Sequence, residues 1–474
     1  MIYKKTKIIC TIGPAVDTVE KISMLIDAGM DAARLNFSHG THDVHEIYIK
    51  NVREAGKLKN KMIAIIQDLP GPKIRVGNLE NQSIELVENQ TISITSVPVT
   101  GTQKVFSTNY PELIYDVKKN EMILLDDGKL RLRVISAEPF DDRIECEIMT
   151  GGILKEHKGI NLPHTNLNLP PFTEKDMIDL DFGLKHDVDF VAMSFVRKAE
   201  DIRFLRDLIE SKGHNKPIIA KIERPEAVEN IDSIIMETDV VMVARGDMGV
   251  EISTEDVPLI QKKIIRKCNE AITPVITATQ MLESMIEHPD PTRAEASDVA
   301  NAILDGTDCV MLSAETSTGM YPILAVTTMK KIILKTETIK KTTYFKDIFI
   351  EDSPENTLHT ICNSAIEIAT RVNAKAIITV THTGKSPLLL SNHRPVAQII
   401  SATHDNNIIK RCKLMWGVES ILIEQHESYN ETFEMVKEKI LANGILTKND
   451  RILIIAPMPF SQTESANMIQ VTEI

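Results

Sequence analysis

The chain has few aromatic residues and few cysteines. Aromatic residues make up 4% of its 474 residues, with a single tryptophan. The six cysteines are Cys10, Cys146, Cys268, Cys309, Cys362 and Cys412. No two of them form a C-x-x-C pair, which excludes a disulfide framework and a zinc knuckle. We therefore expect reduced thiols, as in proteins of the cytoplasm.

The chain also lacks a long apolar run and a net positive charge. No stretch approaches the ~18 apolar residues of a membrane-spanning helix, and the first apolar run, 8–10, meets Gly13 and Pro14 before a signal-peptide core could form. The formal net charge is −13, whereas nucleic-acid and anionic-membrane binders usually carry a basic face. We expect a cytoplasmic protein with no nucleic-acid or membrane partner.

Short apolar, β-branched runs alternate with longer amphipathic segments in the first two thirds of the chain. Hydrophobic residues make up 43% and charged residues 26%, enough to bury about three domains of roughly 150 residues each. The eight runs are 7–13, 31–38, 61–69, 190–195, 217–223, 239–247, 274–280 and 309–315. Eight such β/α units predict an α/β fold with a closed (β/α)8 TIM barrel over 1–69 and 169–343.

Two other regions break this alternation. Residues 70–168 contain short alternating strands at 83–86, 91–95, 121–125, 130–135 and 143–149, which predict a small β-barrel domain inserted as a lid. After residue 344, a helix at 356–372 precedes apolar runs at 376–381, 397–403, 420–424 and 451–457. Residues 344–474 therefore predict a C-terminal α/β domain with a mostly parallel sheet.

Polar residues follow most barrel strands at the point where each strand ends. Arg34, Asn36 and Ser38 share one parity, as do Lys221 with Glu223, Arg245 with Asp247, and Thr277 with Thr279. The third strand ends at Gln67-Asp68 and the eighth at Ser313-Ala314-Glu315. A period of two places each set on one face of its strand. Six strands are therefore expected to direct polar groups at the carboxyl mouth, where the active sites of barrel enzymes lie.

These residue types suit phosphoryl chemistry. Glu223 and Asp247 on neighbouring strands could hold Mg²⁺, which prefers one or two carboxylates and leaves room for water and substrate oxygens. Lys221 supplies a point charge, and Arg34 and Arg75 supply bidentate forks for phosphate. Burying so many ionisable groups without a ligand is costly, which favours a binding site over a set of structural ion pairs.

The strings around these residues resemble pyruvate kinases closely, over nearly the whole chain. They are Arg-Leu-Asn-Phe-Ser-His-Gly at 34–40, Gly-Pro-Lys-Ile-Arg at 71–75, Lys-Ile-Glu at 221–223, Met-Val-Ala-Arg-Gly-Asp-Met-Gly at 242–249, Ala-Thr-Gln-Met-Leu-Glu-Ser-Met at 278–285, and Pro-Thr-Arg-Ala-Glu-Ala-Ser-Asp-Val-Ala-Asn at 291–301. The resemblance implies transfer of phosphate from phosphoenolpyruvate to ADP, giving pyruvate and ATP in the last step of glycolysis. It also implies a homotetramer.

The resemblance assigns roles on the phosphoenolpyruvate side of the site. Lys221 would stabilise the phosphoryl group in flight and Arg34 would hold the phosphate, while Glu223 and Asp247 would bind Mg²⁺, with Mn²⁺ as an alternative. Gly246, Asp247 and Thr279 would bind the substrate carboxylate. Thr279 would also lie near the path of the proton that converts the enolate to pyruvate.

On the nucleotide side, the resemblance assigns Asn36, His39 and Arg75, with Lys158 reaching in from the inserted domain. Closing that domain would exclude water from the mouth and prevent hydrolysis of the phosphate. Prolines at both crossings predict hinges near 70–72 and 168–171.

One departure from the family pattern concerns the monovalent cation. Members that require K⁺ carry Thr-Lys-Gly-Pro-Glu where this chain reads Leu-Pro-Gly-Pro-Lys at 69–73. Asn36, Ser38 and Asp68 of the cation pocket are present, but Lys73 places an ammonium where the K⁺-requiring members have a carboxylate. We expect this tethered charge to replace K⁺, so that catalysis does not require it.

A loop in the C-terminal domain suggests a regulatory site. Thr381, Thr383, Gly384, Lys385 and Ser386 follow a predicted strand and open a helix, whose N-terminal N–H groups favour anions. The same loop in pyruvate kinases resembles the binding site of a sugar-phosphate or nucleotide activator. We therefore expect a phosphorylated small-molecule effector, of unspecified identity.

Two other functions are open at this point. A barrel lyase that uses Mg²⁺ and an enolate, of the aldolase or citramalyl type, would explain Glu223 and Asp247 but not the inserted domain or Arg75. A catalytically silent effector sensor would need a broken site, and the main polar positions are all present. ADP-dependent formation of pyruvate separates the lyase from the kinase.

Two sets of regularly spaced residues favour simpler interpretations than ligand binding. His39, His42 and His45 could form a zinc face. Because no cysteine or acidic partner accompanies them, a solvated helix start is the simpler interpretation. Met281 and Met285 favour core packing.

Overall fold

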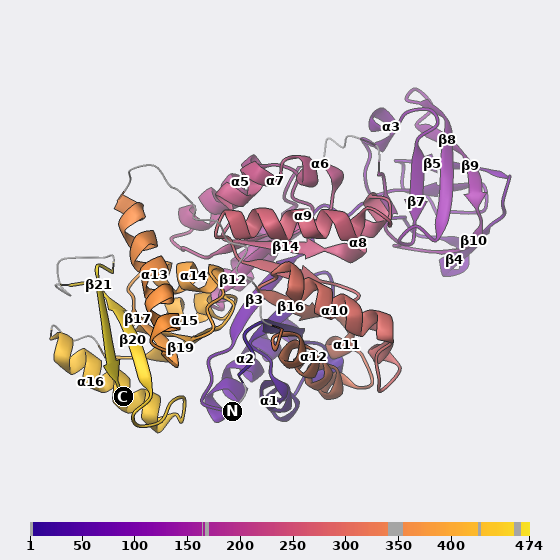
Figure 1. Ribbon diagram of the computed structural model, residues 1–474. Helices are drawn as coiled ribbons and strands as arrows, with labels where there is room; N and C mark the ends of the chain where they lie inside the picture. The colour runs from indigo at the N-terminus through magenta and orange to yellow at the C-terminus, as the bar shows by residue number, and fades with distance from the viewer. Residues whose placement is uncertain (1–2, 164, 166–169, 340–353, 425–427, 459–465) are drawn as a thin grey trace.

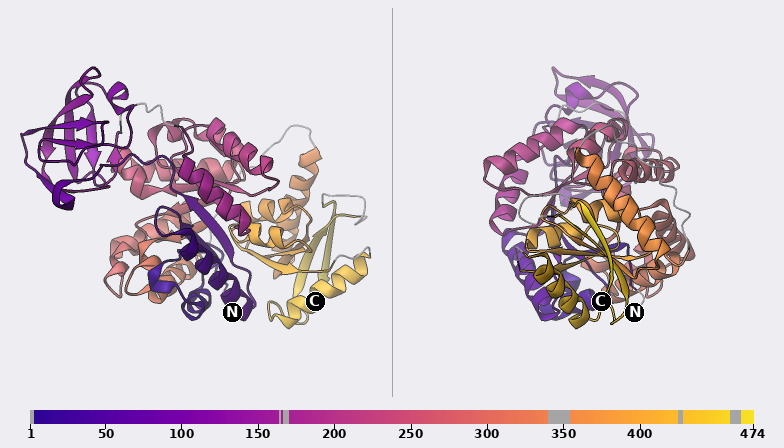
Figure 2. Two further views of the ribbon diagram at one scale, coloured as in Figure 1. Left: turned by 180° about the vertical axis from the view of Figure 1, so that it is seen from behind. Right: turned by 60° about the vertical axis from the view of Figure 1, so that its left-hand side comes forward.

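The computed structural model describes residues 3–163, 165, 170–339, 354–424, 428–458 and 466–474. Its central body is a barrel, with a β-rich domain projecting from one side and a second α/β domain packed against another (Figures 1 and 2). The predicted boundaries at 168/169 and 343/344 lie outside the described residues, as does part of the predicted hinge at 168–171.

Eight parallel strands close the barrel, as predicted. They are β1 (Lys7–Thr11), β2 (Ala32–Asn36), β3 (Ala64–Leu69), β12 (Phe190–Met193), β13 (Ile218–Ile222), β14 (Val240–Ala244), β15 (Val275–Ala278) and β16 (Cys309–Leu312). Their order around the barrel is β1-β16-β15-β14-β13-β12-β3-β2. Each strand lies inside one of the eight apolar runs, and Arg34, Asp68 and Lys221 lie on the strands themselves.

Helices and short helical turns surround these strands. They are η1 (Pro14–Val16), α1 (Val19–Ala28), α2 (His42–Leu58), α4 (Glu174–Lys185), α5 (Ala199–Ser211), α6 (Pro225–Glu229), α7 (Ile231–Glu237), α8 (Arg245–Glu251), α9 (Val257–Glu270), η3 (Glu283–Ile286), α10 (Arg293–Asp305), α11 (Ala314–Ser317) and α12 (Pro322–Thr336). Thr173 and Thr292 begin α4 and α10 with capping boxes, which satisfy backbone N–H groups that a helix start leaves unpaired. In the described part of the chain, no helix combines the length and the apolar character needed to cross a bilayer.

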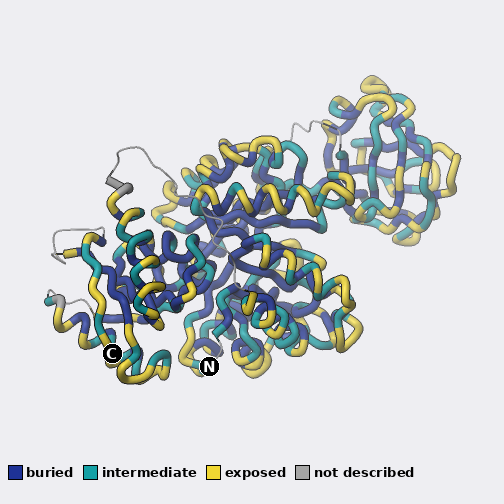
Figure 3. Tube along the Cα trace, viewed as in Figure 1, coloured by how far each residue is buried: buried dark blue, intermediate teal, exposed yellow. Residues whose placement is uncertain are grey.

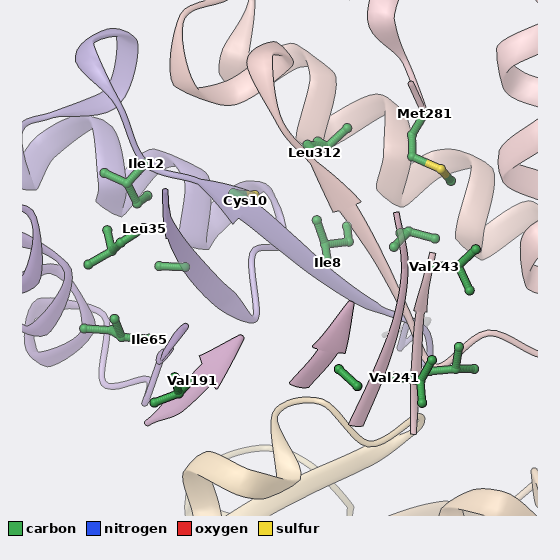
Figure 4. Close-up of a cluster of buried hydrophobic side chains, with 14 of the residues drawn as sticks. Ile8, Cys10, Ile12, Leu35, Ile65, Val191, Val241, Val243, Met281 and Leu312 are labelled. Carbon is green, nitrogen blue, oxygen red and sulfur yellow. The ribbon is translucent and has the colours of Figure 1, made fainter. Parts of the chain in front are cut away.

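Apolar side chains fill two layers of the barrel. The outer layer lies between strands and helices and includes Ile8, Cys10, Leu35 and Val241 (Figure 4), and buried residues concentrate along the strands (Figure 3). The inner layer takes the alternate strand positions, and Leu414 of the C-terminal domain joins it. All six cysteines are buried and free.

The inserted domain is a β structure whose strands agree with the five predicted runs, but it contains three further short strands. Its elements are η2 (Glu80–Gln82), β4 (Ser83–Leu86), β5 (Thr91–Thr95), β6 (Val105–Ser107), α3 (Leu113–Asp116), β7 (Met122–Leu125), β8 (Leu130–Glu138), β9 (Arg143–Thr150), β10 (Gly152–Lys155) and β11 (Ile160–Asn161). The sequence did not predict β6, β10 and β11. Backbone bonds Val76 N–Lys158 O and Ile160 N–Ile74 O pair the incoming and outgoing chains into a narrow neck.

The C-terminal domain has a five-stranded, mostly parallel sheet of order β19-β18-β17-β20-β21. Its elements are α13 (Pro354–Arg371), β17 (Ala376–Val380), α14 (Lys385–Asn392), β18 (Gln398–Thr403), α15 (Asn406–Cys412), β19 (Val418–Leu422), α16 (Tyr429–Ala442), β20 (Arg451–Ala456) and β21 (Met468–Glu473). The antiparallel edge strand β21 was not predicted.

A buried ion pair joins the barrel to this domain. Arg394 Nη2 lies 2.8 Å from Asp308 Oδ1, with side chains 4% and 6% exposed, and the guanidinium also stacks on Trp416.

Because removing one partner leaves the other charge buried and unpaired, Arg394→Met should lower the free energy of unfolding by about 3 kcal/mol. Urea unfolding midpoints measure the loss. The matched change Arg371→Met, which breaks an exposed pair with Glu367, should cost less than about 0.5 kcal/mol, and equal losses would contradict the prediction.

Candidate functional site

Alternate residues on the barrel strands point into the barrel, and at the carboxyl mouth several of these residues are ionisable. Ile66 on β3 and Ile219 on β13 point into the barrel, so Asp68 and Lys221, two residues further on, point the same way. Arg34 follows the inward-facing Ala32 on β2 by the same rule. These side chains meet directly above the apolar inner layer.

Lys221 lies at the centre of this group. Its Nζ is 3.2 Å from Asp68 Oδ1 and 3.0 Å from Glu223 Oε1, and it donates a hydrogen bond to Ser194 Oγ at 2.7 Å. Burial alone would lower the pKa of Lys221, but the two carboxylates outweigh it and raise the pKa above its usual value. Lys221 is therefore a fixed positive charge in a buried position.

Glu223 is fully buried beside it. Its Oε2 accepts the Phe195 N–H at 2.8 Å, and apart from the Lys221 ammonium, its buried Oε1 has no hydrogen-bond donor in the described part of the chain. Burial raises the pKa of Glu223 to about 7; Lys221 opposes this rise and the nearby charge of Asp247 adds to it. A divalent cation between Glu223 and Asp247 would relieve that repulsion.

The donor set fits a hard cation rather than a closed zinc site. Among the described residues, no group of three or more His, Cys, Asp or Glu side chains is arranged to hold a metal. A cation here would use two carboxylates and leave its other positions to water and substrate oxygens, which is the coordination that Mg²⁺ prefers.

Arg34 is oriented by Asp68. Its Nε and Nη2 each lie 2.6 Å from Asp68 Oδ2, and Nη1 donates to Thr11 Oγ1 at 3.1 Å. Asp68 thus lies between Arg34 and Lys221, and these two cations lower its pKa against the effect of burial. The arrangement fixes two positive charges at one side of the mouth.

A strained turn borders the other side. Thr279 and Gln280 have φ of 66° and 54°, a conformation that is costly for a β-branched residue such as threonine and that clusters at functional sites. Thr279 Oγ1 donates to Ala278 O at 2.6 Å and accepts the Gly246 N–H at 2.7 Å. The Gly246 N–H predicted for the substrate carboxylate therefore already has a partner. Arg245 Nη2 donates to Thr279 O at 2.7 Å and braces the turn.

Three polar side chains predicted to point at the mouth lie elsewhere. Thr277 has the outward parity and its Oγ1 donates to Thr307 Oγ1 at 3.0 Å. Arg245 opens α8, where the period of two no longer holds, and Nη1 pairs with Asp298 Oδ2 at 2.6 Å. The buried Glu315 accepts two backbone N–H groups, at 3.1 and 2.7 Å. The predictions for Arg245 and Glu315 were wrong because their strands end before these residues, and the prediction for Thr277 was wrong because its parity on β15 is outward.

A cavity of about 550 Å³ lies between the mouth and the neck of the inserted domain. Its lining includes Ser38, His39, Lys73, Arg75, Asn109 and Lys175. Burial and the neighbouring Arg75, Arg34 and Lys73 charges lower the pKa of His39, so three cations lie close to one imidazole. Asn36 accepts the Ser38 N–H at 3.2 Å, and Arg75 Nη1 donates to His157 O at 2.9 Å.

Lys73, the predicted substitute for K⁺, lies beside Asp247. Its Nζ is 3.8 Å from Asp247 Oδ1, and the two side chains are 27% and 33% exposed. The ammonium faces both the predicted metal ligand and the cavity.

Lys158 does not reach the mouth in this structure. Its Nζ pairs with Asp126 Oδ1 at 2.7 Å inside the inserted domain, although the neck that holds it also carries Arg75. Contact with a nucleotide at the mouth would require the inserted domain to move and this pair to open.

The predicted effector loop has a compact backbone. Gly384 has φ of 82° and is the N-cap of α14, a conformation that glycine adopts without strain. Its N–H donates to Thr381 Oγ1 at 3.0 Å, and the Lys385 N–H donates to Thr383 Oγ1 at 3.4 Å. The side chain of Ser386 is buried behind the loop.

Two residues of the site were not predicted. Ser194 accepts from Lys221 and donates to Leu69 O at 2.7 Å. Strand parity could have identified it, since it follows the inward-facing Ala192 by two. Lys175, on α4, donates to Phe37 O at 3.0 Å at the cavity edge, and nothing in the sequence placed α4 there.

The expected solvated helix start was wrong for His45, whereas His39 is exposed and His42 is partly exposed. His45 is buried, stacks on Phe37 with ring centres 4.0 Å apart and contacts His39 O at 2.9 Å. His42 lies 2.8 Å from Asp179, an acidic partner that the sequence did not indicate. Met281 and Met285 are buried in the core, as expected.

Comparison with known proteins agrees with this geometry. The model of the pyruvate kinase barrel domain matches residues 3–326, and that of the pyruvate kinase alpha/beta domain matches residues 359–472. A pyruvate kinase of Geobacillus stearothermophilus is 44% identical over 469 residues, covering 99% of this chain and 80% of the relative, and one of Staphylococcus aureus is 42% identical over 471 residues with the same coverage. The crystal structure of a pyruvate kinase from Cryptosporidium parvum has a TM-score of 0.91 and 38% identity, over 99% of this chain and 96% of that one. Sequence, fold and the charges gathered at the barrel mouth lead to one conclusion, that the chain belongs to the pyruvate kinase family.

Proposed function

We propose that this chain transfers the phosphoryl group of phosphoenolpyruvate to ADP with Mg²⁺ or Mn²⁺ as its divalent cofactor and without a requirement for K⁺. Family membership implies the two substrates. The observation that carries the assignment of the site is the buried Lys221, held between Asp68 and Glu223 at the barrel mouth. A fixed positive charge in a site shielded from water stabilises a phosphoryl group in transfer more strongly than one in bulk solvent.

The phosphoryl group would lie between Lys221 and Arg34. Both cations are oriented by Asp68, so they need little rearrangement when the substrate binds. Glu223 and Asp247 would bind the divalent ion, which would neutralise charge on the phosphoryl and carboxylate oxygens. The substrate carboxylate would displace Thr279 Oγ1 from the Gly246 N–H.

The nucleotide would occupy the cavity beside the neck. Arg75 and His39 line it, Asn36 borders it, and the ADP phosphates would meet the positive charges that lower the pKa of His39. Movement of the inserted domain about its neck would bring Lys158 from Asp126 to the nucleotide and exclude water. The predicted hinge residues 70–72 line this cavity.

Thr279 would act after transfer, when the enolate takes a proton. A threonine hydroxyl is a weak acid, so its role would be to position a water that delivers the proton. Its strained backbone and its bond to the Ala278 carbonyl hold the hydroxyl in one place.

Thr279→Ala should lower kcat by about tenfold to a hundredfold, because proton transfer loses the hydroxyl that organises it. Thr279→Ser keeps the hydroxyl and should stay within about threefold of the parent. Steady-state kinetics with circular dichroism as a folding control would measure both. An alanine variant with the kcat of the parent would rule out this role.

The overall proposal is tested by following pyruvate with lactate dehydrogenase and NADH. Pyruvate should form only when phosphoenolpyruvate, ADP and Mg²⁺ are all present, in buffer whose only monovalent cation is tetramethylammonium. Pyruvate formed without ADP would indicate a lyase or phosphatase. Activity that appears only when K⁺ is added would contradict the proposed role of Lys73 but leave the reaction unchanged.

Regulation and assembly form the remaining part of the proposal. A phosphorylated effector would bind the loop of Thr381, Thr383, Gly384, Lys385 and Ser386, whose backbone N–H groups lie at the start of α14. Assays with a series of sugar phosphates and AMP, repeated on Lys385→Ala, would identify it.

A homotetramer is expected in light scattering. A cytoplasmic location stays a prediction from the sequence.

A further inference from the structure

A second large hollow lies at the amino end of the barrel, away from the mouth. Its volume is about 660 Å³, and its walls come from two domains. The C-terminal half of α2 and the segment before β3 form the barrel wall, while α15, β19 and α16 form the other. Figure 1 shows α2 close to α15 and β19 at this junction. We call this hollow the interdomain groove.

The groove is lined by basic side chains. They are Arg53, Lys57, Lys61, Lys410, Lys413 and Lys439, with Glu419 as the one acidic residue of the lining. The chain as a whole carries a net charge of −13. The positive charge of the groove therefore has the opposite sign to that of the whole chain. A concave surface of one sign attracts ligands of the opposite sign.

Some of these cations are already neutralised by structural contacts. Arg53 Nη2 and Lys410 Nζ each lie 2.8 Å from an oxygen of Asp189, beneath the groove. Lys413 Nζ is 3.8 Å from Glu419 Oε1. These pairs position the floor and join the two domains.

Other cations are available to a ligand. Lys57 and Lys61 are exposed, and in the described part of the chain neither ammonium has a hydrogen bond or ion pair. Lys439 Nζ donates only to the neutral Leu422 O, at 2.7 Å. Free positive charge therefore lies on both walls of the groove.

We propose that the interdomain groove binds a small anion with several phosphoryl groups, held by Lys57 and Lys61 of the barrel and by Lys439 of the C-terminal domain. An anion with charge at two ends can contact both walls at once, whereas a single phosphate carries its charge at one point. The volume is within the range of ~300–1,000 Å³ typical of small-molecule sites. The amides of Asn60, Asn406 and Asn443 also line the groove and supply neutral donors.

This site is separate from the two anion sites of the proposed function. It lies at the amino ends of the barrel strands, and none of its lining residues belongs to the mouth or to the loop that begins at Thr381. Because its ligand would contact both domains, binding would also stabilise their junction.

Isothermal titration calorimetry of the full chain with inorganic tripolyphosphate, in metal-free buffer, tests the proposal. Lys57→Glu/Lys61→Glu should weaken binding by about tenfold, because two attractive exposed charges become repulsive. Lys57→Arg/Lys61→Arg should bind within about twofold of the parent. Orthophosphate should bind at least about tenfold more weakly than tripolyphosphate, because it engages one wall.

Lys335→Glu is the matched control. Lys335, like Lys57, is an exposed lysine in the last turn of a long helix, but it lies outside the groove. Its reversal should leave affinity unchanged, and an equal loss would show that only overall charge matters. Full affinity in Lys57→Glu/Lys61→Glu, or loss of binding in Arg75→Ala or Lys385→Ala instead, would place the probe elsewhere and overturn the proposal.

Discussion

Replacing Lys221 with methionine should lower kcat by about a thousandfold while the barrel stays folded. The ammonium lies 3.0–3.2 Å from two carboxylate oxygens, and its side chain is only 10% exposed. A preorganised charge that contacts the transferring group contributes a factor of about 10²–10³ in kcat. Lys221 also orients its neighbours, so its loss should reach the upper end of that range.

The same change should destabilise the protein, by about 3 kcal/mol, because Glu223 and Asp68 lose a buried counter-charge. Asp68 keeps its bonds to Arg34, which limits the damage to one side of the mouth. Activity should be compared at a temperature where circular dichroism shows the variant folded.

Lys216→Met is a suitable control for Lys221→Met. Lys216 precedes the same strand at its opposite end and pairs with Asp187 at 2.5 Å, far from the mouth. Its removal should change stability by no more than about 1 kcal/mol and leave kcat unchanged. A folded Lys221→Met enzyme that kept a tenth of the parent kcat would contradict the role given to this lysine.

The barrel was predictable because its signal is repeated. Each strand has a buried apolar run with a fixed parity, and that parity carries Arg34, Asp68 and Lys221 to one place. The same rule would have identified Ser194. Applying this parity rule needs only the sequence, because a parallel strand that is buried on both faces has few alternative registers.

The wrong predictions about side-chain direction concern residues at or just after the ends of strands. Arg245 begins a helix, so its side chain turns away from the direction that the strand would give. Thr277 lies on β15 with the outward parity, and Thr279 reaches the mouth only because the chain adopts positive φ there. Such a conformation depends on bonds from Arg245 and Gly246, which are distant in sequence.

The other omissions depend on tertiary contacts as well. The strands β6, β10 and β11 have two to four residues, too few for a periodic pattern, and they form by pairing with longer neighbours. His45 is buried because Phe37 stacks on it, which the local sequence pattern of a helix start does not reveal.

Lys73→Glu should make the enzyme dependent on K⁺. In the parent, the Lys73 ammonium lies 3.8 Å from Asp247 and faces the proposed nucleotide cavity. With glutamate there, Asp68, Asp247 and the new carboxylate would concentrate negative charge at the mouth, and a monovalent cation would have to restore the balance beside Asn36 and Ser38. Without K⁺, kcat should fall by about a hundredfold or more, because one preorganised charge is lost.

The assay compares chloride salts of K⁺ and tetramethylammonium at equal ionic strength of about 0.1 M, so that screening is constant. The parent should be equally active in both, and Lys73→Glu should recover most of its activity only in K⁺. Lys73→Gln is the matched control, since it removes the ammonium without supplying a carboxylate to bind the ion, and K⁺ should restore it poorly. If the parent required K⁺, or if Lys73→Gln and Lys73→Glu responded alike, the charge of Lys73 would not be the substitute for the ion.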